Sequence, residues 1–228
     1  MATIVKREHR TVREIERPAA SELVELRELG VTTVHEAQQQ VGLLEAGIDP
    51  VVDGSFASGP AVTVLCLPGD SLMVHAAIEV AQPGDVLVIT TTEGATTDAL
   101  LDELIVTECR AHGIAAVVLD AAVRDVAHIR DVGYPVWCRT VHAQGTTKER
   151  LGSVNVPVLI GGVTVSPGDA VIADGDGVVV VPRARVTAVL ERARERDAAD
   201  SAARERYALG ELSIDVLGLR DRLQEHPG

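Results

Sequence analysis

The N-terminal part of the chain shows the 3.6-residue period of amphipathic helices. Leucines recur at helical spacing across residues 21–29, and Gly30 predicts the end of that helix. Thr33 followed by Glu36 has the spacing of a capping box, so a second short helix is expected to begin there. Two consecutive helices are therefore predicted before the first long strand.

Short β-branched runs and helical segments alternate through the rest of the chain. A strand–helix–strand unit of the observed length implies parallel strands with a right-handed crossover. Ser71 is the expected N-cap of the first helix in this region. The expected strands cover residues 61–68, 84–90, 114–120, 134–140, 156–162, 170–174 and 177–182, and the expected helices cover residues 72–82, 102–112, 124–133 and 183–209.

An Asp-Gly-Asp-Gly sequence at residues 174–177 separates the last two predicted strands. It predicts a hairpin turn, and a calcium loop is disfavoured because the remaining EF-hand ligands are missing. The charged helix that follows has an exposed face that is either solvated or packed on a neighbouring subunit. We therefore expect a single domain over residues 1–228, with residues 183–228 as a C-terminal helical segment at a candidate subunit contact.

Composition favours an α/β fold in which helices cover a sheet. Hydrophobic residues make up 46% of the chain and aromatic residues only 2%, so small aliphatic side chains must fill the core. The formal net charge of −13 argues against nucleic acid or an anionic membrane as a partner. No apolar run reaches the roughly 20 residues of a membrane helix. The N-terminus lacks the apolar region of a signal peptide. The three cysteines have no metal-ligand spacing, as expected of buried thiols in the cytoplasm.

Arg124-Asp125 is the most informative pair of polar residues. The common motifs for nucleotide binding, zinc proteolysis and serine hydrolysis are absent. The pair follows a predicted buried strand, and the carboxyl ends of parallel strands line the crevice where α/β proteins bind ligands. Arginine can bind a carboxylate through its planar fork, and aspartate offers a hard oxygen ligand. On residue type alone, however, an ordinary surface ion pair at a helix start is the favoured interpretation.

Two further features favour a binding site. Glu103 begins a predicted helix whose partner strand ends at Arg124, and the N–H groups of Leu104 and Ile105 at that helix start would bind an anion. Lys148 lies in a predicted loop and could bring an ammonium group to the same crevice. Cations, an anion site and a carboxylate describe a pocket for an α-keto acid. A chelated metal there would stabilise its enolate.

Residues 101–125 resemble the signature of the class II 4-hydroxy-4-methyl-2-oxoglutarate/4-carboxy-4-hydroxy-2-oxoadipate aldolases, which share a fold with the regulator of ribonuclease E activity A. The acid-x20-Arg-Asp motif of these aldolases matches Glu103, twenty intervening residues and Arg124-Asp125. The similarity runs from about residue 30 and includes residues 83–90, 145–183 and 207–215. It implies an α-β-β-α sandwich with a central mixed β-sheet flanked by helices, assembled as a homotrimer or a dimer of trimers (a homohexamer).

The resemblance also implies roles for individual residues. Asp125 would bind Mg²⁺ or Mn²⁺ directly, Glu103 would hold a metal-bound water, and Arg124 would bind the pyruvyl group. The N–H groups of Leu104 and Ile105 would hold the pyruvate carboxylate.

Three more residues fall in matching segments. Lys148 is expected to contact the distal carboxylate of the substrate. Glu36 is either a capping-box residue or an outer metal ligand acting through water, and His75 is either a substrate contact or a core histidine. The aldolases usually carry Gly where this chain has Asp102. An Asp there either caps the helix or faces the pocket, where it would change substrate affinity or choice.

The implied reaction is cleavage of a 4-hydroxy-2-oxo acid to pyruvate and a second keto acid. Oxaloacetate decarboxylation is the expected side activity, and aromatic-acid degradation is the expected setting. Two alternative functions remain open. The first is a non-catalytic regulator that binds a ribonuclease, although the regulatory branch of the family lacks the Asp that this chain has at Asp125. The second is a Schiff-base aldolase that uses Lys148.

Overall fold

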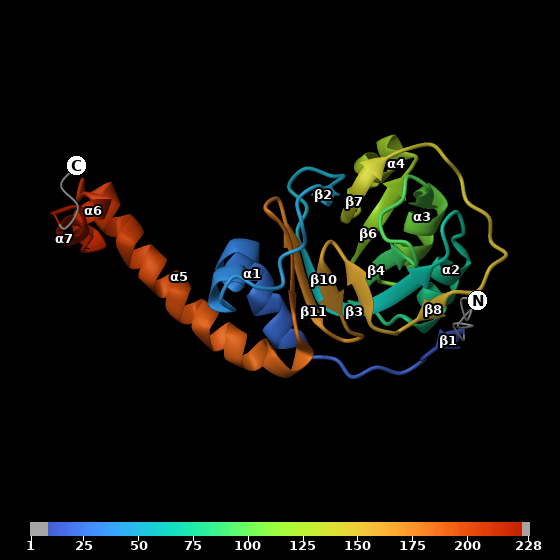
Figure 1. Ribbon diagram of the computed structural model, residues 1–228, viewed down its shortest axis with the longest axis horizontal. Helices are drawn as coiled ribbons and strands as arrows, with labels where there is room; N and C mark the ends of the chain where they lie inside the picture. Colours follow the sequence, from blue (N-terminus) through green and yellow to red (C-terminus); the bar gives the residue numbers. More distant parts are fainter. Residues whose placement is uncertain (1–8, 225–228) are drawn as a thin grey trace, which may run out of the picture.

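The computed structural model describes residues 9–224, and a mixed sheet with helices on both sides organises them (Figure 1). The sheet order is β1-β8-β3-β4-β6-β7-β2, with β11 and β12 joined through β3 and with β5 joined to β6. The strands are β1 Arg10–Thr11, β2 Asp49–Pro50, β3 Ala57–Cys66, β4 Val86–Thr91, β5 Ala99–Leu101, β6 Ala116–Val123, β7 Val136–Val141, β8 Ser153–Val154, β9 Val158–Ile160, β10 Val163–Val165, β11 Ala170–Asp174 and β12 Gly177–Val181. The helices are α1 Ala20–Ala37, α2 Leu72–Val80, α3 Glu103–Ala111, α4 Val126–Val132, the 3₁₀ turn η1 Arg183–Arg185, α5 Val186–Ala208, α6 Ser213–Val216 and α7 Arg220–Gln224.

Four parallel strands form the centre of the sheet, as the strand–helix–strand pattern predicts. β3, β4, β6 and β7 pair in parallel, with Val62 opposite Leu87 and Val117 opposite Val136. Every residue of β4 and of β6 is buried, because these strands are covered on both faces. Their carboxyl ends therefore share one edge of the sheet.

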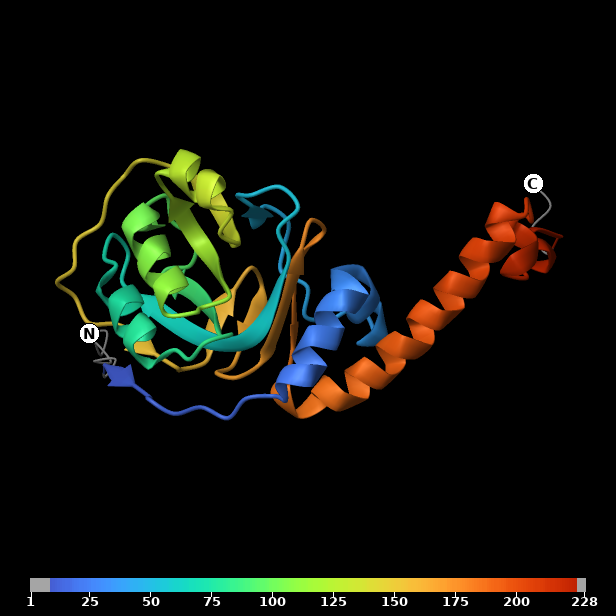
Figure 2. The ribbon, with the colours of Figure 1, turned by 180° about the vertical axis from the view of Figure 1, so that it is seen from behind.

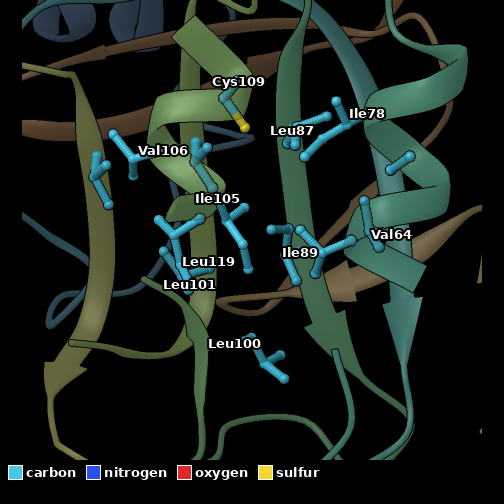
Figure 3. Close-up of a cluster of buried hydrophobic side chains, with 14 of the residues drawn as sticks. Val64, Ile78, Leu87, Ile89, Leu100, Leu101, Ile105, Val106, Cys109 and Leu119 are labelled. Atoms are coloured by element: carbon cyan, nitrogen blue, oxygen red, sulfur yellow. The ribbon is translucent and has the colours of Figure 1, made fainter. Parts of the chain in front are cut away.

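Three hydrophobic clusters give the layer order α-β-β-α and confirm the expected architecture. The first packs α2, α3 and α4 on one face of the parallel strands, and Figure 3 shows side chains such as Ile78, Leu87 and Ile105 pointing toward one another. The second lies between the opposite face of these strands and the β11–β12 hairpin. The third packs α1 and α5 on the far side of that hairpin (Figure 2). Alternate residues of β11 divide between the last two clusters: Val171 joins the second, and Ile172 joins the third.

Helix α1 bends at Gly30, where the sequence predicts the end of a helix. Gly30 has φ 79° and ψ 165°, outside the helical region, and the helix resumes directly at Val31. The predicted capping box at Thr33 is wrong, because Asp174 Oδ2 accepts the Val31 N–H at 2.8 Å. Asp174 lies in the β11–β12 turn, where its pairing with Gly177 confirms the predicted hairpin. A tertiary contact therefore replaces the expected local cap.

Ser71 occupies the predicted N-cap position of α2, but its side chain caps nothing. Asp70, the residue before it, accepts the Leu72 N–H through Oδ1 at 3.0 Å. Asp70, the last residue of the Pro-Gly-Asp turn, therefore caps the start of α2 in place of Ser71.

Helix α5 is longer than the layer beneath it. Its first half packs on α1 through buried side chains, and the rest projects beyond the sheet together with α6 and α7 (Figures 1 and 2). The buried members of α5 are Val186, Val189, Leu190 and Ala193.

No helix within residues 9–224 has the length and apolar character needed to cross a membrane.

Candidate functional site

Strand β5 brings the start of α3 next to the Arg124-Asp125 pair. β5 runs parallel to β6, with Leu101 opposite Val123, and the Arg124 N–H donates to the Leu101 carbonyl at 3.1 Å. Because Asp102 and Glu103 follow Leu101 directly, both reach the carboxyl end of β6. Two of the predicted site regions, which are separated by twenty intervening residues in the sequence, therefore meet at one edge of the sheet.

Asp125 has a backbone conformation that few non-glycine residues adopt. Its φ of 59° and ψ of 33° place it in the left-handed region, which costs on the order of 1 kcal/mol or more and often occurs at functional sites. It holds the N-cap position of α4, yet its side chain makes no capping hydrogen bond and is 47% exposed. Asp125 is therefore not an ordinary helix-capping acid, and its carboxylate is available to a ligand.

Neighbouring groups hold the Arg124 guanidinium on several sides. Its Nη2 donates to Asp102 Oδ2 at 2.6 Å, and its Nε lies 3.6 Å from Asp125 Oδ2. A Cβ at Gly145 would lie 2.9 Å from Nη1, so only a residue without a side chain allows this approach. Arg124 is thus shared between two carboxylates beneath the 145–150 loop.

The Asp102 side chain caps α3 and is almost completely buried. Its Oδ1 accepts the Ile105 N–H at 3.1 Å, which confirms the capping role considered from the sequence. Burial alone would raise the pKa of Asp102, but the hydrogen bonds from Ile105 and Arg124 and the positive charge of Lys148 outweigh it and lower the pKa. The Asp102 carboxylate is therefore ionised at neutral pH.

This contact changes the predicted anion site at the start of α3. The Ile105 N–H, expected to hold the pyruvate carboxylate, already donates to Asp102. The Leu104 N–H has no acceptor among residues 9–224, and its side chain is exposed. One of the two predicted backbone donors is therefore occupied by the protein itself.

Glu103 faces a histidine that the sequence analysis missed. His128 Nε2 lies 3.4 Å from Glu103 Oε2, and both side chains are partly exposed. His128 lies three residues after Asp125, the spacing that places two side chains on one helix face. That spacing was the available signal, and the structure adds an imidazole to the predicted group of residues.

The loop that carries Lys148 is fixed by a buried carboxylate, Asp70. Asp70 Oδ2 accepts hydrogen bonds from Thr147 Oγ1 at 2.7 Å, the Glu149 N–H at 2.8 Å and the Arg150 N–H at 3.1 Å. Lys148 is exposed at the loop tip, and its charge lowers the pKa of Asp102. Lys148 therefore lies close enough to the start of α3 for its charge to act on Asp102, whereas the sequence gave no hint of the role of Asp70.

Two predicted residues lie elsewhere in this chain. Glu36 forms an ion pair of 2.6 Å with Arg196 at the contact of α1 with α5, across the β11–β12 hairpin from α3 and α4 (Figures 1 and 2). Within one chain, Glu36 therefore does not join Arg124. His75 is a residue of α2 whose side chain faces α3, with Nδ1 3.8 Å from Glu108 Oε2. No hydrogen bond or ion pair within residues 9–224 connects His75 to Arg124.

The donor set suits a hard divalent ion better than zinc. No group of three or more His, Cys, Asp or Glu side chains within the described range could enclose a metal. Mg²⁺ is commonly held by one or two carboxylates together with water and substrate oxygens, whereas structural zinc needs four protein ligands. The exposed Asp125 carboxylate, with Glu103 at the adjacent helix start, fits the first pattern.

One sizeable cavity in the described part of the chain lies apart from these residues. It has a volume of about 480 Å³ and is lined by residues 90–94, residues 157–159 and Leu65. Its ionisable lining residue is Glu93, and it contains no cation that could bind an oxo acid. The candidate site is therefore the group of charged side chains around Arg124, where charges of both signs converge.

Comparisons with known proteins agree with the resemblance found in the sequence. The model of the RraA-like family, described as Aldolase/RraA, matches residues 31–180. A protein of Halalkalibacterium halodurans, named "Putative 4-hydroxy-4-methyl-2-oxoglutarate aldolase", is 33% identical over 207 residues, covering 90% of this chain and 96% of the relative.

Solved structures share the fold. An uncharacterised protein of Pseudomonas syringae superposes with a TM-score of 0.79 at 27% identity, covering 89% of this chain and 99% of that one. Streptomyces coelicolor RraAS2, described as an unusual member of the RNase ES inhibitor RraA protein family, superposes with a TM-score of 0.74 at 29% identity, covering 84% and 99% of the two chains.

Proposed function

Because this chain belongs to the RraA-like (Aldolase/RraA) family, we propose that it is a divalent-metal-dependent aldolase that cleaves a 4-hydroxy-2-oxo acid to pyruvate and a second keto acid. The observation that carries the proposal is the exposed carboxylate of Asp125, held in a left-handed conformation beside Arg124. A surface ion pair needs no such conformation. The name of the Halalkalibacterium relative supports 4-hydroxy-4-methyl-2-oxoglutarate as a substrate, with 4-carboxy-4-hydroxy-2-oxoadipate as a related one.

In this proposal, Arg124 binds the keto oxygen and carboxylate of the pyruvyl part and stabilises the negative charge that develops there. Asp125 would hold Mg²⁺ or Mn²⁺, with Glu103 as an outer ligand. The bound ion would act as a Lewis acid toward the keto oxygen. Lys148, at the tip of the 145–150 loop, is placed to meet the distal carboxylate of the substrate.

The proposed cleavage requires a group on the chain to accept the proton of the 4-hydroxyl. The 4-hydroxyl loses its proton as the C3–C4 bond breaks, and the electron pair of that bond moves to C3 to form the enolate of pyruvate. The 4-carbon leaves as the carbonyl of the second keto acid, and protonation of the enolate at C3 completes pyruvate. The Glu103–His128 pair, 3.4 Å apart at the start of α3 and α4, can accept the hydroxyl proton. By the same enolate chemistry we expect decarboxylation of oxaloacetate.

The test compares Asp125, at the N-cap of α4, with Asp131, within the same helix. Asp125→Asn should lower Mg²⁺-dependent oxaloacetate decarboxylation at least about a hundredfold, since a proposed direct ligand is lost. Asp131→Asn changes an exposed residue of α4 and serves as the matched control, with activity within about twofold of wild type. Undiminished activity of Asp125→Asn would refute the role of Asp125.

The same preparations separate two alternative functions. A non-catalytic regulator, suggested by the name of the Streptomyces neighbour, predicts no turnover in any preparation and ribonuclease binding that survives Asp125→Asn. A Schiff-base aldolase predicts that borohydride and pyruvate label Lys148. That mechanism is disfavoured because Lys148 is solvent-exposed, whereas a reactive lysine depends on a desolvated pocket.

We also propose that the chain assembles as a homotrimer or a dimer of trimers. The outer half of α5 has no layer beneath it, and large apolar side chains near its end are exposed. A second chain would cover them and could bring Glu36 toward a neighbouring site. The exposed residues are Leu209, Leu212 and Leu217.

A further inference from the structure

The Asp102 carboxylate lies where the groups expected to bind an oxo-acid carboxylate converge. One oxygen accepts the Ile105 N–H at the start of α3, and the other accepts from Arg124 Nη2 at 2.6 Å. The Lys148 ammonium adds positive charge from the loop above. A helix N-terminus, a guanidinium and an ammonium are the groups that recognise a carboxylate ligand. Here the carboxylate belongs to the protein.

We propose that Asp102 is a specificity-determining residue that competes with the 2-carboxylate of an oxo acid for Arg124 and the Ile105 N–H. The inference rests on the proposed function and refines its substrate class. An incoming oxo acid must displace Asp102 from Arg124 or bind with a reduced set of donors. The chain therefore binds simple 2-oxo acids such as pyruvate more weakly than it would without this side chain.

In the protein without a ligand, Asp102 stays bonded to Arg124 and the Ile105 N–H, but nothing in the backbone requires an aspartate at this position. The Asp102 backbone is extended, with φ −137° and ψ 179°, so any residue can occupy the position without strain. Its side chain is only 12% exposed, which leaves little space for a second carboxylate beside it. The Leu104 N–H, which has no acceptor among residues 9–224, stays available to a ligand. A substrate carboxylate beside Arg124 would also be repelled by the negative charge of Asp102.

Asp102→Gly removes the competing carboxylate with little effect on the helix, since Gly is well tolerated at an N-cap. Pyruvate binding is measured by ligand-observed NMR titration in Mg²⁺ buffer and again in chelator. We expect the Gly variant to bind pyruvate about tenfold to a hundredfold more tightly than wild type, the range of one hydrogen bond to a charged partner. Pyruvamide, the uncharged analogue, should bind within about twofold in both proteins.

Asp102→Asn is the shape-matched control. It keeps an acceptor for the Ile105 N–H but loses the charge, so its gain for pyruvate should lie between those of wild type and Asp102→Gly. If circular dichroism shows that the Gly variant is not folded, Asp102→Ser replaces it, because serine caps a helix but is too short to reach Arg124.

Pyruvate affinity that is unchanged or weaker in a folded Gly or Ser variant would overturn the inference, as would no pyruvate binding to any of the proteins. An equal gain for pyruvamide would also overturn it, because the competition would then not concern charge. The titration needs no turnover. Failure of the aldolase proposal, seen as absent metal-dependent cleavage, is therefore distinguishable from failure of the role of Asp102.

Discussion

Asp70→Asn should loosen the 145–150 loop and destabilise the fold, because this carboxylate is fully buried and satisfies four donors. Oδ2 accepts from Thr147, Glu149 and Arg150, and Oδ1 accepts from the Leu72 N–H. The asparagine side chain has only one oxygen. When that oxygen takes the place of Oδ2 and keeps three hydrogen bonds, the amide NH₂ takes the place of Oδ1 and faces the Leu72 N–H. One buried donor loses its partner, at a cost of about 1–3 kcal/mol, and three other bonds lose charge assistance.

The expected loss in the free energy of unfolding is therefore about 2–4 kcal/mol, which a domain with roughly 5–15 kcal/mol of stability survives. Burial alone would raise the pKa of Asp70, but its hydrogen bonds outweigh burial and lower the pKa. A lowered pKa means that this stabilisation is present above about pH 3.9 and is lost as the pH falls through the folded pKa. The difference between wild type and variant should stay constant from about pH 7 to pH 5 and shrink below about pH 4.

Two assays measure this effect. Urea denaturation gives the free energy of unfolding at each pH. Endoproteinase Lys-C reports on the loop, since Lys6 and Lys148 are the only lysines of the sequence. We expect cleavage after Lys148 to be faster in Asp70→Asn than in wild type.

Asp85→Asn is the matched control. Asp85 ends another Pro-Gly-Asp turn and is equally buried, but it accepts from Arg17 and the Gln82 N–H at the opposite end of the parallel strands. This variant should lose stability without faster cleavage after Lys148. Asp70 does not fix the 145–150 loop if Lys-C cuts both variants at the same rate, and its carboxylate is not the stabilising group if the stability difference for Asp70→Asn persists unchanged at pH 3.

Two more predictions concern the site loop and the assembly. Gly145→Ala places a Cβ 2.9 Å from Arg124 Nη1, so the guanidinium must move, and kcat/KM should fall about tenfold or more while stability changes by less than about 1 kcal/mol. Steady-state kinetics and thermal melting measure the two effects, and unchanged kinetics would show that Arg124 is not positioned by this contact. Sedimentation velocity should give three or six chain masses, and a monomer would contradict the proposed trimer.

The layered fold could be predicted because its signal is local and repeated. The runs that became β4 and β6 are rich in valine and other aliphatic residues, and the helical periods of α2 and α3 lie between clear turn sequences. The parallel pairing then follows from connection length and handedness. Glu103 and Arg124 could be matched by their spacing, and β5 explains in the structure why that spacing brings them together.

The missed features depend on contacts between distant segments. β5 has only three residues within a polar stretch, so no periodic pattern marks it. The cap of Val31 comes from Asp174, which no local rule could supply. The sharing of Arg124 between Asp102 and Asp125, and the close approach of Gly145, also required the folded chain.

The proposed function is metal-dependent cleavage of a 4-hydroxy-2-oxo acid at Asp125. Its most direct test follows pyruvate release from 4-hydroxy-4-methyl-2-oxoglutarate through the NADH consumption of coupled lactate dehydrogenase. We predict turnover with Mg²⁺ or Mn²⁺, its loss in EDTA, and its recovery when excess Mg²⁺ is restored. Equal rates in EDTA and in Mg²⁺, or no pyruvate release with either metal, would rule out metal-dependent cleavage by this chain.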